Sequence, residues 1–402
     1  MQDSLCNTVT TSSTEALRQI DAAIDLYARA WPGALEAAGA ATREDPELSI
    51  GHALQGLIHA MWGRRSAAAE CMSRARSSAR PVSSRESSLL ELLEHVVRGR
   101  THSALAWLLA HLRRFPTDLL ALTPGMGAYG LFAFSGRADH NELRLALLDE
   151  LEPLYPREFP WLLAYRGWAR IELGAVDEGL GMALRAIDLR PQNAHNAHIV
   201  AHGFHEGGRP AEYLAFLSGW LPEYPADALM WGHLQWHAAI AELEIGDEHA
   251  AQERCVNRLM PHLPKSAPFM GLADGPSILW RLGLRGKTAL PWDLVSQHAR
   301  DHFPNGSNAF GEIHLAMVAS ATGNNEALTQ CAQRLERLAS DGYLGALVGL
   351  SWVAALVALR AGRQGEGERF LEECEAGAVR LGGSFAQRSI ISETRRARRL
   401  PT

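Results

Sequence analysis

The sequence lacks the features that mark a secreted or a membrane protein. Its five cysteines are scattered and odd in number, and none forms a CxxC or zinc-ribbon spacing. No apolar run reaches the roughly 18 residues that a membrane-spanning helix needs. The polar residues 1–14 show no charged segment followed by an apolar one, so no signal peptide is evident. We therefore expect reduced thiols and a cytoplasmic protein with no membrane partner.

The sequence also lacks an excess of basic residues and any pattern typical of β-strands. The 39 basic and 45 acidic side chains give a formal net charge of -6, which argues against a nucleic-acid partner. Only the tail at 390–402 is basic, and we expect it to be a frayed chain end. No segment shows sustained alternation of apolar and polar residues, so we expect no sheet.

What the sequence does have is a regular spacing of glycine and proline. Six loop glycines are each followed 17 or 18 residues later by a proline. The pairs are Gly63/Pro81, Gly99/Pro116, Gly136/Pro153, Gly174/Pro191, Gly208/Pro225 and Gly246/Pro264. Glycine permits the left-handed turn that ends one helix, and proline marks the start of the next unit because it cannot continue a helix. The spacing therefore predicts consecutive helical hairpins.

Two adjacent hairpins repeat at 34 residues, which is the tetratricopeptide period, and one stretch fits that consensus in part. Counting from Pro160, Gly167 stands at position eight. Ala186 and Pro191 stand at positions 27 and 32, while the tryptophan of the first turn is displaced to Trp161. We therefore predict an all-α fold, a solenoid of degenerate tetratricopeptide-like hairpins wound as a right-handed superhelix that encloses a polar inner pocket.

This architecture predicts a single α-solenoid domain over residues 1–402. We expect the polar residues 1–12 to be disordered. The regular rhythm breaks at 265–310, which is rich in glycine, proline, serine and asparagine but also holds two tryptophans and two histidines. Because large rings are awkward in a solvated tether, we expect short helices in an irregular, insertion-like segment there.

Histidine is concentrated in two expected helices in the middle of the chain. Residues 195–237 hold six of the 17 histidines. The first helix carries His195, His198, His202 and His205 at steps of three, four and three, followed by Glu206. The second helix carries Trp231, His233, Trp236 and His237. A core helix normally turns leucine and valine inward, so an inner face made of titratable groups indicates a site.

Four sequence boxes around these helices carry a resemblance to a known family. They are Ala197-His198-Ile-Val-Ala201-His202 with Gly208-Arg209, His233-Leu-Gln-Trp236-His237 with Leu243-Glu244-Ile-Gly246, Asp274-Gly-Pro-Ser277-Ile-Leu-Trp280-Arg281-Leu, and Phe310-Gly-Glu-Ile-His314. With the earlier pair Arg85-Glu86, they resemble the motifs of the tetratricopeptide repeat protein 38-like family over residues 20–360. Where that family has a second acidic residue at one helix end, Glu172 stands alone. The resemblance implies an all-helical superhelix, and it implies no established activity.

The histidine face predicts a ligand site on the inner, concave wall, where the first helices of neighbouring hairpins lie side by side. Histidine exchanges a proton near neutral pH, so we predict general acid/base roles for His202 and His237, with Asp274 orienting an imidazole. The predicted ligand-binding residues are His198, Glu206, Trp231, His233, Trp236, Ser277, Trp280 and His314. Among these, the tryptophans are expected to form a wall that keeps water out.

Two other interpretations of the histidines stay open. His233 and His237 are four residues apart on one helix face, which is the two-ligand geometry of a zinc helix, and His202 with Asp274 would complete a set of four ligands. The metal itself stays unknown, with zinc as one candidate, because Leu234 stands where a zinc helix usually has an acidic residue. Alternatively, each imidazole is a buried structural group that bonds to its neighbours.

The function that follows is the binding of a small polar molecule, extended to general acid/base chemistry in a histidine-rich pocket. The alternative is a non-catalytic scaffold that takes a peptide or a partner protein in its groove. A ligand site predicts clustered, mostly buried imidazoles with perturbed pKa values. A scaffold predicts an open groove with exposed side chains.

Overall fold

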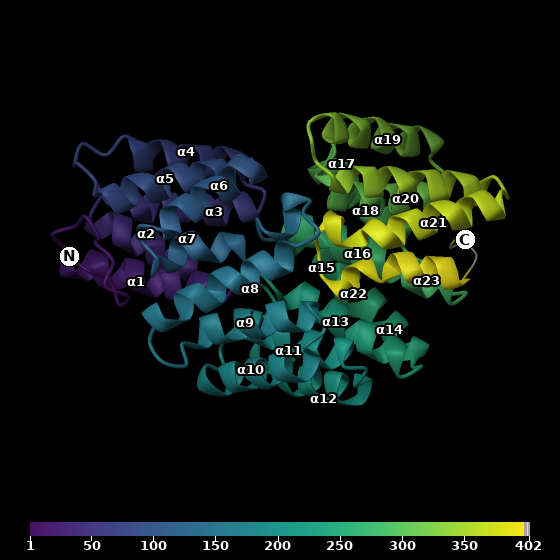
Figure 1. The fold of residues 1–402 in the computed structure, drawn as a ribbon, viewed down its shortest axis with the longest axis horizontal. Coiled ribbons are helices and arrows are strands. Elements are labelled where there is room, and N and C mark those ends of the chain that lie inside the picture. Colours follow the sequence, from purple (N-terminus) through teal and green to yellow (C-terminus); the bar gives the residue numbers. More distant parts are fainter. Residues whose placement is uncertain (398–399, 401–402) are drawn as a thin grey trace. The chain divides into compact units, whose positions relative to one another are not determined.

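The chain is helical throughout its described part. The computed structural model describes residues 1–397 and Leu400, and in this part of the chain the one strand-like pairing is an isolated antiparallel bridge between Gln2 and Thr8. The helices follow one another as packed hairpins (Figure 1). The predictions of an all-α fold and of tetratricopeptide-like helical hairpins are confirmed.

Glycine turns separate the two helices of each hairpin, as the glycine–proline spacing predicts. All six of the predicted glycines have a positive φ, which glycine adopts without the steric cost that a Cβ brings. Five of them lie between the helices of a pair. The pairs are α3 (Ser49–Met61) with α4 (Arg65–Arg76), α5 (Ser84–Val97) with α6 (Thr101–Leu112), α9 (Pro160–Glu172) with α10 (Val176–Leu189), α11 (Ala194–Glu206) with α12 (Pro210–Trp220), and α13 (Trp231–Glu244) with α14 (Glu248–Arg254).

The chain divides into two compact units, where the sequence predicts one domain. Unit 1 comprises Met1–Phe132 and Glu142–Val200, and unit 2 comprises Ala133–Asn141 and Ala201–Thr402. The chain therefore enters unit 2 twice, first as a short segment and later from within helix α11.

Side-chain caps fix the starts of two helices in unit 1. Ser13 accepts a hydrogen bond from the backbone N–H of Ala16 at the start of the first helix, and Ser83 and Glu86 form a reciprocal capping box at the start of α5. Besides the hairpins above, its elements are α1 (Thr14–Ala28), α2 (Ala34–Glu44), α7 (Leu119–Leu122), η1 (Thr123–Gly125), most of α8 (His140–Leu151) and η3 (Glu152–Leu154). Consecutive helices from α1 to α7 pack against one another.

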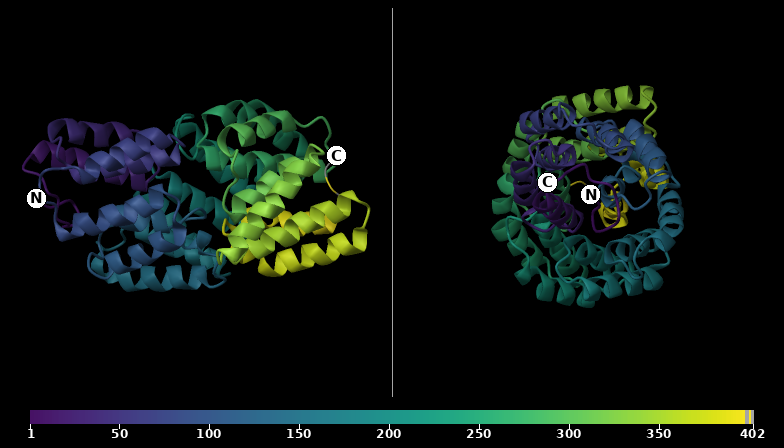
Figure 2. Two further views of the ribbon diagram at one scale, coloured as in Figure 1. Left: turned by 90° about the horizontal axis from the view of Figure 1, so that it is seen from above. Right: turned by 90° about the vertical axis from the view of Figure 1, so that its left-hand side faces the viewer.

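Unit 2 stacks its hairpins in the manner of a solenoid. The first helices of successive hairpins, α13, α16, α18 and α20, each pack against the next, and each also packs against its own second helix (Figures 1 and 2). The further elements are η2 (Ala133–Ser135), η4 (Leu221–Glu223), the π-helical turn η5 (Cys255–Leu259), α15 (Met260–His262), η6 (Leu263–Lys265), α16 (Pro268–Leu284), α17 (Trp292–His302), α18 (Ala309–Ala321), α19 (Asn325–Ser340), α20 (Gly345–Arg360), α21 (Gln364–Gly377), η7 (Ala378–Leu381), α22 (Phe385–Arg388) and α23 (Ile390–Ala397).

The segment 265–310, which is expected to be irregular, contains a long and deeply buried helix. Every residue of α16 from Gly271 to Leu284 is buried, and α17 packs against it as the second helix of a hairpin. Glycines and Pro276 make the segment look irregular, but helix propensity is a weak prior that burial of a whole face overrides.

Described segments near both ends of the chain are packed, although disorder is expected at 1–12 and fraying at 390–402. Val9 is completely buried, and the backbone N–H of Thr10 donates to the Glu86 carboxylate at 2.8 Å. At the other end, α23 buries Ile390 and Ile391 and contacts α16 and α21. Apolar side chains therefore anchor both segments. Part of the predicted basic tail, residues 398–399 and 401–402, lies outside the described residues.

The structure also bears on the cysteines and on the apolar character of the helices. None of the five cysteines forms a disulfide. Among the described residues, no helix combines the length and the apolar character that crossing a membrane requires.

The crossing of α9 and α10 in unit 1 depends on two glycines. A Cβ atom on Gly167 of α9 would lie 2.6 Å from the carbonyl oxygen of Gly179 on α10, and a Cβ on Gly179 would lie 2.5 Å from the carbonyl oxygen of Gly167. Gly167 is the residue that the sequence places at position eight of the repeat. The absence of a side chain there is what lets the two backbones meet.

We expect Gly167→Ala to lower the free energy of unfolding by about 1–3 kcal/mol, because the added methyl group overpacks a backbone contact that cannot yield. Urea denaturation of the purified chain measures the change. Gly181→Ala, on the solvent side of α10 with no atom within 4 Å of the new Cβ, is the matched control and should be neutral or stabilising. Equal effects of the two substitutions would contradict the packing role of Gly167.

Candidate functional site

Helix α13 places polar side chains in the core of unit 2. Its residues from Gly232 to Leu243 are all buried, so His233 and His237 cannot reach bulk solvent. His202, near the end of α11, meets His237 with ring centroids 4.5 Å apart and ring planes at 83°. The Tyr213 hydroxyl of α12 shares a short hydrogen bond with Nδ1 of His237. Imidazoles from two separate segments thus converge on one interior point, as the histidine spacing predicts.

A carboxylate from α16 joins this cluster through the second imidazole of α13. Nδ1 of His233 donates to Oδ1 of Asp274 at 2.8 Å, and both groups are buried. The ring of His233 lies parallel to Trp236 at 5.4 Å and edge-on to His237 at 4.8 Å. Asp274 therefore holds His233 in one orientation, and the part of Asp274 in catalysis stays a prediction.

Arg281 of α16 connects this cluster to the chain's C-terminal helices. Its guanidinium carbon lies 5.5 Å from the centre of the Trp236 ring, an arrangement that permits a cation–π interaction. The same group donates to the hydroxyl of Ser277 and, at 2.9 Å, to the carboxylate of Glu393 on α23. Although Arg281 is only 2% exposed, its charge is compensated by these partners.

The remaining predicted site residues lie apart from the imidazole pair or at its edge. Trp280 donates to Thr394 Oγ1 in the core, and Trp231 packs on His262. Nδ1 of His314 bonds to the carbonyl oxygen of Phe310, and His198 packs on Trp168 within unit 1. Glu206 lies 3.5 Å from His202 on the same helix. The structure thus brings His202, His233, Trp236, His237 and Asp274 together, and Ser277 reaches them through Arg281.

Burial sets the protonation of the cluster. Removal from water lowers the pKa of His202 well below its usual value, and the charges of His205, His233 and Arg388 lower it further. Burial also lowers the pKa of His314, to about 4, with a contribution from Arg281. Burial raises the pKa of Tyr213 well above its usual value, helped by the Glu244 carboxylate. His202, His314 and Tyr213 are therefore uncharged near neutral pH.

Space for a ligand lies beside the cluster and not within it. The cavity that borders His233 and Asp274 has a volume of about 20 Å³, room for about one water molecule. A cavity of about 520 Å³, here called the Arg281 cavity, opens at the far end of α13. It is lined by His205, Ile240, Leu243, Arg281, Leu284, Arg285, Phe385, Ser389, Ser392, Glu393, Arg396 and Ala397.

His205 is the imidazole that lines this cavity. Its Nδ1 lies 2.6 Å from the Glu244 carboxylate, and its ring centroid lies 6.3 Å from that of Phe385. An imidazole that lies beside a carboxylate on a cavity wall can bind a polar group or transfer a proton. Sequence reasoning places His205 in the histidine run but omits it from the site, and nothing in the sequence links it to Phe385.

Metal binding by the four predicted ligands stays a prediction. Within unit 2, His202 and His237 bring ring nitrogens within 4.8 Å of each other. Asp274, however, bonds to Nδ1 of His233, and Tyr213 bonds to Nδ1 of His237. Bonds of this kind orient an imidazole through one nitrogen, as carboxylates do behind metal-bound histidines.

No protein-family profile matches the sequence. Among solved structures, the chain is similar to one described as Naa15/Naa10 bound to HypK-THB, with 12% sequence identity and a TM-score of 0.23. The match covers 90% of this chain and 58% of that one, so this chain spans little more than half of the length of the chain that it matches. At that TM-score, no property of the complex is transferred to this chain.

Proposed function

We propose that unit 2 binds a small anionic polar molecule in the Arg281 cavity. Three arginines, Arg281, Arg285 and Arg396, line a space that contains a single carboxylate, that of Glu393. Burial raises the pKa of Glu393, but the charges of Arg281 and Arg285 outweigh that effect and keep it ionised. The net positive charge of the lining is the observation that supports the proposal.

The buried histidine cluster then acts as the rigid support of the cavity. The polar contacts from Asp274 through His233 and Trp236 end at Arg281, which is part of the cavity wall and is held there by Glu393. We assign any proton transfer to His205, with Glu244 as its neighbouring carboxylate, because His202 and His237 are completely buried. Chemistry at His202, His237 and Asp274 stays a prediction from the sequence.

Membership of the tetratricopeptide repeat protein 38-like family is part of the same proposal, and the four sequence boxes support it. Two of these boxes supply the support of the cavity: Trp236 comes from the second, and Asp274 and Arg281 come from the third. The cytoplasmic location also stays our expectation, supported by the absence of disulfides.

We expect the double substitution Arg285→Gln with Arg396→Gln to weaken citrate binding by at least tenfold. Each residue offers a charged donor to the cavity, and a hydrogen bond to a charged group contributes about 1.5–3 kcal/mol. Isothermal titration of the full chain with citrate measures the affinity. The control is Arg337→Gln on α19, because Arg337 is exposed and does not line the Arg281 cavity. This substitution should leave citrate binding unchanged.

Two outcomes of that titration would reject the proposal. One is a wild-type chain that binds citrate no better than the double variant does. The other is a loss of affinity that Arg337→Gln reproduces, since the effect would then come from general surface charge. Failure of the wild-type chain to bind citrate, succinate and phosphate alike would favour the scaffold alternative.

A further inference from the structure

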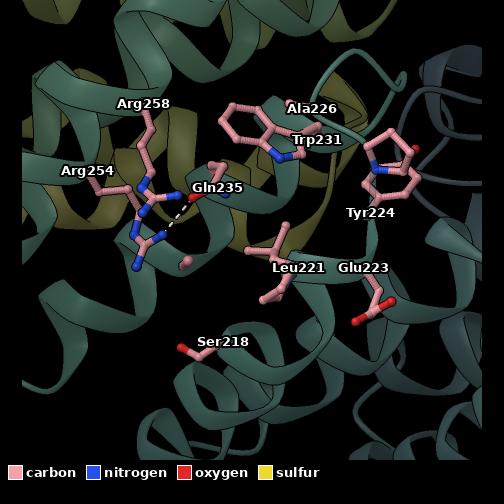
Figure 3. A pocket seen from close by; sticks show the side chains of 12 residues that line it. Ser218, Leu221, Glu223, Tyr224, Ala226, Trp231, Gln235, Arg254 and Arg258 are labelled. Carbon is pink, nitrogen blue, oxygen red and sulfur yellow. Dashed lines mark hydrogen bonds between the residues drawn. The ribbon is translucent and has the colours of Figure 1, made fainter.

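A second cavity in unit 2, here called the Trp231 pocket, shares no lining residue with the Arg281 cavity. Its volume is about 630 Å³, and it lies between α12, η4, α13, α14 and the π-helical turn η5. It is lined by Ser218, Leu221, Pro222, Glu223, Tyr224, Pro225, Ala226, Trp231, Gln235, Ala238, Arg254 and Arg258 (Figure 3). The sequence places Trp231 at the histidine site, and the structure places it on the wall of this separate pocket.

Two arginines lie at one end of the Trp231 pocket, and the charge of only one of them is paired with a carboxylate of the fold. Arg254 donates to the Glu242 carboxylate at 2.5 Å, so its charge is neutralised within the fold. Arg258 is exposed, and among the described residues no carboxylate lies within 4 Å of its guanidinium group. Arg258 is therefore the group at this end that can pair with a ligand anion.

A buried amide lies beside these arginines and is held in one orientation. Gln235 is 2% exposed, and its Oε1 accepts a hydrogen bond from Nη1 of Arg254 at 2.6 Å (Figure 3). With the oxygen used in this way, the amide NH₂ group is the part of Gln235 that remains to donate to a ligand. A carboxylate placed between the Gln235 amide and Arg258 would thus receive donors from both.

The helix that supplies Arg258 is locally widened where it lines the pocket. Residues Cys255–Leu259 form a π-helical turn that ends with a bond from the N–H of Met260 to the carbonyl oxygen of Cys255. Such turns insert one extra residue into a helix and occur frequently at functional sites. Here the widened turn contains Arg258, and Figure 3 shows its side chain on the same side of the pocket as Arg254.

Aromatic rings line the part of the Trp231 pocket away from the arginines. Trp231 packs on His262 with ring centroids 4.9 Å apart. Tyr224 packs on Trp220 at 5.1 Å, and its hydroxyl accepts a hydrogen bond from the backbone N–H of Met230 at 3.2 Å. These contacts hold both rings in place, so they offer a preformed apolar wall on which a flat ring can stack.

We propose that the Trp231 pocket binds an aromatic carboxylate. The carboxylate pairs with Arg258 and accepts from the Gln235 amide, while the ring packs against Trp231. Glu223 lies across the pocket from both arginines (Figure 3) and repels an anion there, so the charge distribution selects the orientation with the carboxylate at Arg258.

The test uses the full chain and benzoate as the probe, with binding measured by isothermal titration. We expect Arg258→Gln to weaken benzoate binding by tenfold or more, since it removes the one uncompensated charge at that end. Trp231→Ala should weaken benzoate binding but leave the much weaker binding of acetate unchanged, because acetate has no ring. Benzyl alcohol, which has the ring but no charge, should bind the wild-type chain at least tenfold more weakly than benzoate.

Three results would overturn the inference. They are equal benzoate affinity in the wild-type chain and Arg258→Gln, equal binding of benzyl alcohol and benzoate, and a loss of benzoate binding in the exposed control Arg337→Gln. Arg258 is exposed, so its substitution leaves the core of unit 2 intact. The double variant Arg285→Gln with Arg396→Gln should bind benzoate normally, which separates the failure of this inference from the failure of the proposal for the Arg281 cavity.

Discussion

Substituting Asp118 by alanine should lower the free energy of unfolding by about 3–5 kcal/mol, the largest single effect that we expect in unit 1. Asp118 is completely buried and receives a hydrogen bond from Nε of Arg85 at 2.7 Å and from Nε2 of His111 at 3.1 Å. Arg85 is only 3% exposed, so removal of Asp118 leaves a buried guanidinium without its nearest counter-charge. Asp118 also caps helix α7 by accepting from the backbone N–H of Ala121.

Urea denaturation of wild type and Asp118→Ala at pH 7 measures this loss. The matched control in unit 1 is Glu158→Ala, which removes the carboxylate of an exposed pair with Arg185 and should change stability little. A second variant, Arg85→Met in the Asp118→Ala background, removes the stranded charge and should recover part of the loss. Equal stability of wild type and Asp118→Ala would show that the buried pair contributes nothing.

Acidification from pH 6.5 to about 4 should destabilise unit 2 by roughly 1 kcal/mol per pH unit through His314 alone. Burial lowers the pKa of His314 to about 4, whereas an unfolded histidine titrates near 6.5. In that window His314 is protonated in the unfolded chain but not in the folded chain. The free energy of unfolding therefore rises with pH and levels off above about pH 6.5. The lowered pKa of His202 acts in the same direction.

The carboxylate of Asp118 does not account for a loss in that window. The charge of Arg85 and the hydrogen bond from His111 outweigh burial and hold the pKa of Asp118 below its usual value. Its contribution to stability is therefore present above the unfolded pKa of about 3.9 and disappears only at lower pH. Between pH 4.5 and 6.5, Asp118 therefore does not share the loss of stability that is expected through His314 and His202.

Urea unfolding at half-unit steps from pH 7 to 4.5 checks this prediction. His314→Leu removes the titrating ring while keeping an apolar side chain in the core, and its stability should fall less steeply with acidification than that of the wild type. His249→Leu is the control, because the His249 side chain is 83% exposed and should not affect the slope. A wild-type slope that is unchanged in His314→Leu would contradict the assignment to His314.

The hairpins could be predicted because their causes are local. A glycine ends one helix and a proline marks the next start whatever the rest of the chain does, and all six predicted glycines have the left-handed conformation. Local propensity gave the wrong expectation at α16, where three glycines and Pro276 suggested irregularity. There, burial of the helix against its neighbours outweighs the local preference.

The meeting of His202 and His237 could also be predicted, because neighbouring hairpins place corresponding helices side by side. Their complete burial could not, since a polar face that lines a cavity and one that packs against other rings have the same spacing in sequence. For the same reason, nothing in the sequence separates Trp231, on a cavity wall, from Trp236, in the core.

The sequence by itself determined the all-helical fold, the hairpin turns and the register that brings two histidine helices together, because each depends on residues close in the chain or one repeat apart. Only the tertiary structure decided where a ligand has room. Arg281 bonds to Ala386 across 105 residues and to Glu393 across 112, and these contacts close the wall of the Arg281 cavity. Contacts at such separations leave no periodic pattern, so their location follows from packing alone.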